Sequence, residues 1–132
     1  MANAKSTQMW FAKAREDLKV AKHLHPNEKD FFSGILFHCQ QSAEKSIKGF
    51  LTFHNLRIYK THDMNMLLEK VRQINSDLAD KYIGVINMTI YAVEYRYPDF
   101  EHTLPPLNEN LVTDAIQLTV LIFNELTQLV NE

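Results

Sequence analysis

The feature that most constrains the fold is a narrow apolar stripe at helical spacing between residues 30 and 54. At about 100° per residue, its side chains fall within roughly 60–70° of arc on one face of a helix. The stripe comprises Phe32, Leu36, Cys39, Ala43, Ile47 and Phe50. A stripe this long predicts a helix over 30–54 that packs against other helices in a bundle.

Apolar spacing and helix punctuation predict four further helices, over residues 7–24, over 61–74, from 76 to just before Pro98, and over 110–130. Thr61 is the expected N-cap of the second of these. Only 3 Gly and 4 Pro occur among the 132 residues, too few turn formers for a many-stranded β fold. We therefore predict an all-α fold, an up-and-down antiparallel helical bundle of about five helices, in a single domain over residues 1–132.

Composition narrows the class of protein. With 45% hydrophobic and 23% charged residues, the chain is typical of globular rather than disordered proteins. It has no run of about 18 apolar residues and no apolar signal-peptide core, so we expect a cytoplasmic protein without a membrane role. It also has no Cys pair, metal-ligand cluster or Gly-rich phosphate loop, so we expect no metal and no other cofactor. Cys39, the single cysteine, is expected to be a small buried apolar residue.

Charge is distributed unevenly along the chain, although the net charge is only −2. Residues 1–25 and 43–72 each carry a local charge of +3, whereas the segment from residue 94 onward carries −6. Solvated helix faces of mixed charge explain this pattern, and so does a basic surface in the first half that meets phosphates. Charge alone leaves both interpretations open.

Asp17 is a polar residue where the pattern of the first helix requires an apolar one, because it lies on the same face as Trp10 and Ala21. A carboxylate at such a position must be paired or hydrogen-bonded. We expect Asp17 to be buried and paired with a cation, with Arg96 or Lys48 as the best candidates. A salt bridge between helices and a role in a site are both consistent with this placement.

A polar ridge follows the apolar stripe of the second helix. Gln41, Glu44 and Lys48 lie at successive i+3 and i+4 steps, and Gln40 lies at the edge of the stripe. Such a ridge is most often a solvated flank with an ion pair. The alternative interpretation is that it lines a groove between helices or between subunits.

Two pairs of arginine and histidine suggest chemistry on phosphates. Arg57 and His62 are separated by four residues, and Arg96 and His102 by five. A metal-independent ribonuclease needs an imidazole to move a proton and a permanent cation to stabilise charge on the phosphate. Helix capping and structural ion pairs account for the same residues without any catalysis.

Four segments of the chain resemble the HEPN family, the higher eukaryotes and prokaryotes nucleotide-binding domain. In order they are AREDL (14–18), FHCQQSAEKSIK (37–48), THDM (61–64) and YRYPD (95–99). The resemblance implies an all-α bundle, commonly dimeric, that is often encoded beside a minimal nucleotidyltransferase as a toxin–antitoxin pair. Many members are ribonucleases with an Arg-x(4–6)-His motif, which implies Arg96 and His102 as catalytic residues.

The resemblance also implies substrate-binding roles for polar residues of the matched segments, namely Asp17, Glu44, Lys45, Lys48 and His62. The ligand would be a nucleotide or RNA. Family toxins that are silenced by adenylylation carry a Tyr two residues after the motif histidine. Leu104 and Met64 stand at those places here, so this regulation is not expected. The alternative is a non-catalytic nucleotide-binding or dimerisation module that acts with a nucleotidyltransferase.

Aromatic and Met side chains are more numerous on the predicted helix faces than one small core needs. For this reason we also expect a homodimer. The side chains concerned are Trp10, Phe11, Phe31, Phe53, Met64 and Met66.

Overall fold

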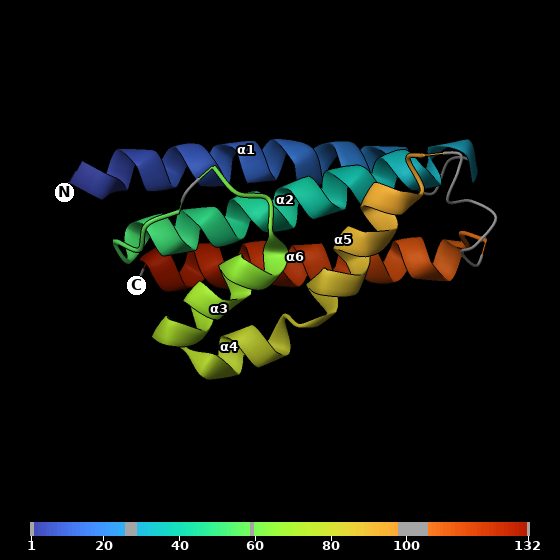
Figure 1. Ribbon diagram of the computed structural model, residues 1–132. Coiled ribbons are helices and arrows are strands. Elements are labelled where there is room, and N and C mark those ends of the chain that lie inside the picture. Colours follow the sequence, from blue (N-terminus) through green and yellow to red (C-terminus); the bar gives the residue numbers. More distant parts are fainter. Residues whose placement is uncertain (1, 26–28, 59, 98–105, 132) are drawn as a thin grey trace.

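The computed structural model describes residues 2–25, 29–58, 60–97 and 106–131. These residues form an all-α helical bundle with no β-strand among them, as predicted (Figure 1). None of the helices in these segments is long and apolar enough to cross a membrane. The elements are α1 (Ala2–Leu24), the 3-10 helix η1 (Lys29–Phe31), α2 (Phe32–Phe53), α3 (Met64–Ile74), α4 (Ser76–Lys81), α5 (Gly84–Glu94) and α6 (Glu109–Asn131).

Helix α2 occupies the centre of the bundle, with the long helices α1 and α6 beside it (Figure 1). Helix α1 is antiparallel to α2, since Ser42 Oγ donates to the Ala14 carbonyl over 2.8 Å whereas His38, earlier in α2, contacts Asp17, later in α1. Helix α6 runs in the same direction as α2, because α3, α4 and α5 first return the chain to the end where α2 began (Figure 1). The bundle is therefore antiparallel between α1 and α2 but parallel between α2 and α6.

The predicted fourth helix is divided into α4 and α5 by a turn at Tyr82. Tyr82 is fully buried, and its hydroxyl donates to Glu125 of α6 over 2.5 Å. Burial and the neighbouring Glu125 carboxylate raise the pKa of Tyr82, so the phenol stays protonated. Lys81 also binds Glu125, at 2.7 Å. These anchors fix the end of α4, and Gly84, a poor helix former, begins the next helix.

The apolar stripe of the second helix forms the core, and each of its six side chains is at most 9% exposed. Cys39 is fully buried, and this burial raises the pKa of its thiol to about 12. The thiol is therefore neutral, and the prediction of a small buried apolar residue is confirmed.

The apolar side chains that suggested a dimer are divided between core and surface. Phe11 and Met64 are buried in the core, which leaves Phe31 and Met66 as the exposed large members of that set. Some of the aromatic and Met side chains that suggested a dimer are thus buried in the core of a single chain.

We predict that Gly49→Ala destabilises the protein by about 1 kcal/mol. An added Cβ at Gly49 would lie 3.2 Å from the Phe11 ring and 3.2 Å from the Trp10 Cβ. Phe11 cannot easily give way, because it is 2% exposed and packs edge-on against Phe123. Overpacking costs about 1–3 kcal/mol, which exceeds the gain of about 0.5–1 kcal/mol from replacing a helical glycine.

Gly34→Ala in the same helix is the matched control, since nothing lies within 4 Å of an added Cβ there. This variant should be stabilised by about 0.4–1 kcal/mol. Urea unfolding followed by circular dichroism measures both changes. A stabilised Gly49→Ala protein would contradict the tight approach of α1 to α2.

Candidate functional site

The polar ridge of α2 is buried rather than solvated. Gln40 is 5% exposed, Glu44 2% and Lys48 5%. The interpretation of this ridge as a solvated flank is therefore wrong for Glu44 and Lys48. His62, from the connection between α2 and α3, contacts Glu44 in this ridge, and Gln40 lines a hollow together with Thr89 and Ala92 of α5.

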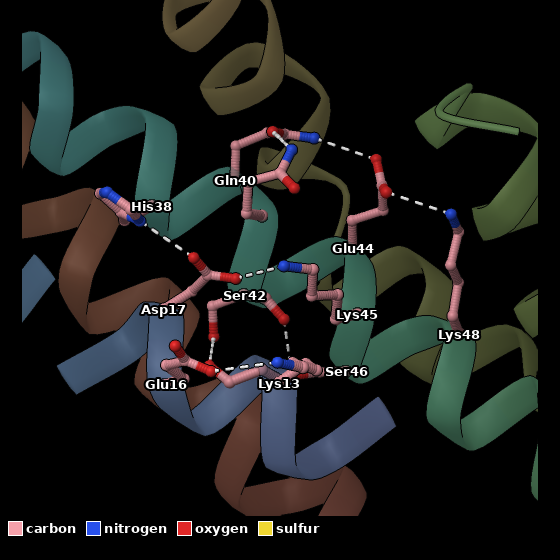
Figure 2. Close-up of polar contacts among 12 residues, drawn as sticks. Lys13, Glu16, Asp17, His38, Gln40, Ser42, Glu44, Lys45, Ser46 and Lys48 are labelled. Carbon is pink, nitrogen blue, oxygen red and sulfur yellow. Dashed lines mark hydrogen bonds and ion pairs between the residues drawn. The ribbon is translucent and has the colours of Figure 1, made fainter. Parts of the chain in front are cut away.

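The Glu44 carboxylate is the centre of a hydrogen-bonded network on α2. Gln40 Nε2 donates to its Oε1 over 3.1 Å, and Lys48 Nζ donates to its Oε2 over 3.1 Å (Figure 2). His62 Nδ1 donates to the same Oε2 over 3.0 Å. Gln41 extends the network, because its Nε2 donates to Gln40 Oε1 over 2.8 Å. The buried Glu44 carboxylate is thus paired with the Lys48 ammonium and also accepts hydrogen bonds from Gln40 and His62.

His62 connects this buried carboxylate to solvent, since its side chain is 79% exposed whereas that of Glu44 is 2% exposed. The start of α3 fixes the backbone at His62. Asp63 is the N-cap and accepts from the Asn65 and Met66 amides, while Thr61 Oγ1 accepts from the Asp63 amide. The predicted N-cap, Thr61, is therefore two residues too early. With Nδ1 donating to Glu44, a neutral His62 ring has Nε2 as its acceptor.

Arg96 and His62 line one hollow of about 260 Å³, together with Gln40, Gln41 and Phe37. We call it the Arg96 hollow. The guanidinium carbon of Arg96 lies 4.1 Å from the centre of the Phe37 ring, in a cation–π arrangement that orients the side chain. The structure thus joins Arg96 to a histidine that precedes it by 34 positions in the sequence.

His62 also lines a second hollow, of about 450 Å³. We call it the Trp10 hollow. Trp10, Lys48, Lys60 and His62 line it, and Lys48 Nζ lies 5.3 Å from the centre of the Trp10 ring. The residues of this hollow other than Lys48 and His62 were not singled out as a site in the sequence. The sequence pattern places Trp10 on the apolar face of the first helix, and Lys60 only adds to the local positive charge.

Asp17 forms a separate cluster between α1 and α2. Its carboxylate accepts from His38 Nδ1 over 2.9 Å and from Lys45 Nζ over 2.6 Å, and Figure 2 shows it between these two side chains. Its side chain is only 13% exposed, so the predicted burial and cationic pairing are confirmed. The predicted partners are wrong, because Lys48 binds Glu44 and Arg96 lies over Phe37 instead.

The predicted site residues therefore fall into two groups. Glu44, Lys48 and His62 are in direct contact, whereas Asp17 and Lys45 pair with each other and line neither hollow. His102 lies outside the described residues, so its pairing with Arg96 stays a prediction. Arg57 of the alternative pair is exposed and also lines neither hollow. Among the described residues, no group of three His, Cys, Asp or Glu side chains is arranged to hold a metal ion.

We predict that Glu44→Gln destabilises the protein by about 3–5 kcal/mol, since it leaves the Lys48 ammonium, 6% exposed, without its buried anion. Adding Lys48→Met to this variant should recover most of the loss, because both charges are then absent. Chemical unfolding of the single and double variants measures the difference.

Glu16→Gln is the matched control, because Lys13 and Glu16 form an ion pair whose side chains are each 69% exposed. This change should alter stability by less than about 0.5 kcal/mol. Equal losses for Glu44→Gln and Glu16→Gln would refute the buried pair.

Comparison with known protein families gives a match to this chain. Residues 7–129 match the HEPN domain, which is nearly the whole chain. No curated protein matches the chain, and no solved structure matches it. The matched range contains the Glu44 network, the Arg96 hollow, and the Trp10 hollow except for its lining residue Ser6. An all-α bundle with a family match over this range places the chain in the HEPN family.

Proposed function

We propose that this chain binds nucleotide or RNA at the Arg96 hollow and cleaves RNA there, as the ribonuclease toxin of a HEPN/nucleotidyltransferase toxin–antitoxin pair. One observation carries the proposal: Arg96 and His62 line the same hollow, and the buried Glu44 carboxylate holds the His62 ring. A guanidinium and an oriented imidazole suit metal-independent cleavage of a phosphodiester. HEPN domains are generally related to nucleotides or RNA, which supports the same assignment.

The proposed reaction is an internal attack of the RNA 2′-hydroxyl on its own phosphate. Arg96 holds the phosphate and stabilises the charge that develops on its oxygens. His62 Nε2 accepts the 2′-hydroxyl proton as the 2′-oxygen bonds to phosphorus. His102 protonates the 5′-oxygen as its bond to phosphorus breaks. The products are a 2′,3′-cyclic phosphate and a free 5′-hydroxyl.

The remaining polar residues have supporting roles in this proposal. Lys48 pairs with the buried Glu44 carboxylate and also lines the Trp10 hollow. Asp17 and Lys45 form an ion pair between α1 and α2. Lys45 would contact the RNA backbone there. The nucleotidyltransferase partner is proposed from the family resemblance.

We predict that the purified protein cleaves single-stranded RNA without added metal, with a pH optimum near neutrality. Arg96→Ala and His102→Ala should each lower the rate on the order of 100- to 10,000-fold while helicity is unchanged. A gel assay of a labelled RNA, with the cyclic phosphate identified by mass spectrometry, measures this loss.

Arg57→Ala is the matched control, because Arg57 is exposed and lines neither hollow. Its cleavage rate should equal that of the wild type. A loss with Arg57→Ala but not with Arg96→Ala would transfer the role to the Arg57/His62 pair. A folded wild type that binds RNA but never cleaves it would favour the non-catalytic nucleotide-binding module.

The homodimer is proposed to form through α5, whose residues from Gly84 to Val93 carry no charge. Ile83, Ile90, Val93 and Tyr97 are 45–56% exposed and recur at steps of seven, three and four. Such spacing places them on one stripe that suits packing against a helix of a second copy. Because Val93 and Tyr97 of this stripe also line the Arg96 hollow, two Arg96 hollows would lie near the dimer axis.

We predict that Ile90→Lys converts the dimer into a monomer, since it places a charge in the middle of the apolar stripe. Light scattering should then give the chain mass of 15.4 kDa instead of twice that value. Leu121→Lys, at a 40% exposed position on α6, should leave the dimer intact. A wild type that stays monomeric at all concentrations would refute the interface.

A further inference from the structure

Trp10 lies where two hollows meet. It lines the Trp10 hollow, and it also lines a third hollow of about 270 Å³ with Ser6, Met9 and Lys13. His62 is likewise shared between the Arg96 hollow and the Trp10 hollow. The three hollows are therefore neighbours: the first two share the His62 imidazole, and the second and third share the Trp10 indole.

The chemistry of these hollows is basic and aromatic. Lys48 and Lys60 line the Trp10 hollow and Lys13 lines the third, and none of the described lining residues of these two hollows is acidic. Lys48 is paired with Glu44 and Lys13 with Glu16. Within the described residues, no ion pair holds Lys60, so its ammonium is available to a ligand. A basic groove that contains an aromatic ring is the arrangement by which proteins bind single-stranded nucleic acid, with phosphates on the cations and a base on the ring.

We propose that the Trp10 hollow is a nucleotide subsite of a single-stranded RNA path, in which Trp10 contacts a base and Lys60 a phosphate. This inference rests on the proposed function, because it places the neighbouring phosphate of the same strand in the Arg96 hollow. The volume of about 450 Å³ is within the range of about 300–1,000 Å³ that ligand sites occupy. Three joined hollows favour a strand over an isolated mononucleotide, which would fill one of them.

Trp10 provides its own reporter, because it is the single tryptophan of the chain. Titration with a short oligoadenylate RNA at low salt should quench its fluorescence, since a base stacks on or beside the indole. Anisotropy of the same RNA carrying a fluorescent label measures affinity independently of Trp10. AMP, tested in parallel, should bind more weakly than the RNA, because it engages a single hollow.

Trp10→Leu should weaken RNA binding by about 5- to 140-fold, the loss expected for one stacked base. Trp10→Phe, which keeps an aromatic ring, should retain most of the affinity and guards against a folding defect in the leucine variant. Phe31→Leu removes a 40% exposed aromatic ring at the far end of α2 and should bind RNA as the wild type does. Circular dichroism checks that each variant is folded.

The outcomes separate this inference from the proposed function. If RNA binds and Arg96→Ala weakens it, but Trp10 fluorescence and Trp10→Leu affinity are unchanged, the nucleotide subsite is refuted and the Arg96 hollow stands. If AMP quenches Trp10 as strongly as the RNA does and binds as tightly, the strand path is refuted. If no RNA binds to the folded wild type, both proposals fall together.

Discussion

The buried charge of Glu44 is the constraint on which the rest of the site depends. A carboxylate that is 2% exposed in the central helix is stable only if its oxygens remain hydrogen-bonded and its charge is offset. Lys48 does this from one turn further along α2, and His62 does it from the segment before α3. The need to satisfy one buried group thus fixes the position of an exposed histidine.

This dependence explains why the site is assembled from distant parts of the sequence. The connection after α2 returns along that helix and brings His62 and Lys60 to its buried polar ridge (Figure 1). Helix α5 then brings Arg96 to the opposite side of His62, where the Phe37 ring receives the guanidinium. His62 and Arg96 both contact side chains of α2, namely Glu44 and Phe37. Helix α2 therefore contributes both to the core and to the site.

Local pattern was sufficient to predict the helices, because apolar spacing depends only on the side chains of one segment. It predicted the stripe of α2 and the burial of Asp17, since an acid on an apolar face must be covered. It did not predict the partners of Asp17. Lys45 and Lys48 both lie on α2, and only the register of α1 against α2 decides which of them meets Asp17. The contact of Ser42 with the Ala14 carbonyl sets that register. The burial of Glu44 was missed for a related reason. The apolar pattern of one helix does not show which later segment packs against the polar residues beside its apolar stripe.

The parallel course of α2 and α6 has a consequence for how the chain is made. During synthesis, α1 and α2 emerge first and can pair as a hairpin, because their contacts are close in sequence. The α6 side of α2 has to wait until residues 109–131 have left the ribosome. Until then, the nascent hairpin exposes part of the core that later receives Ile122 and Leu126. A chain that ends before α6 therefore exposes apolar surface through which it can aggregate.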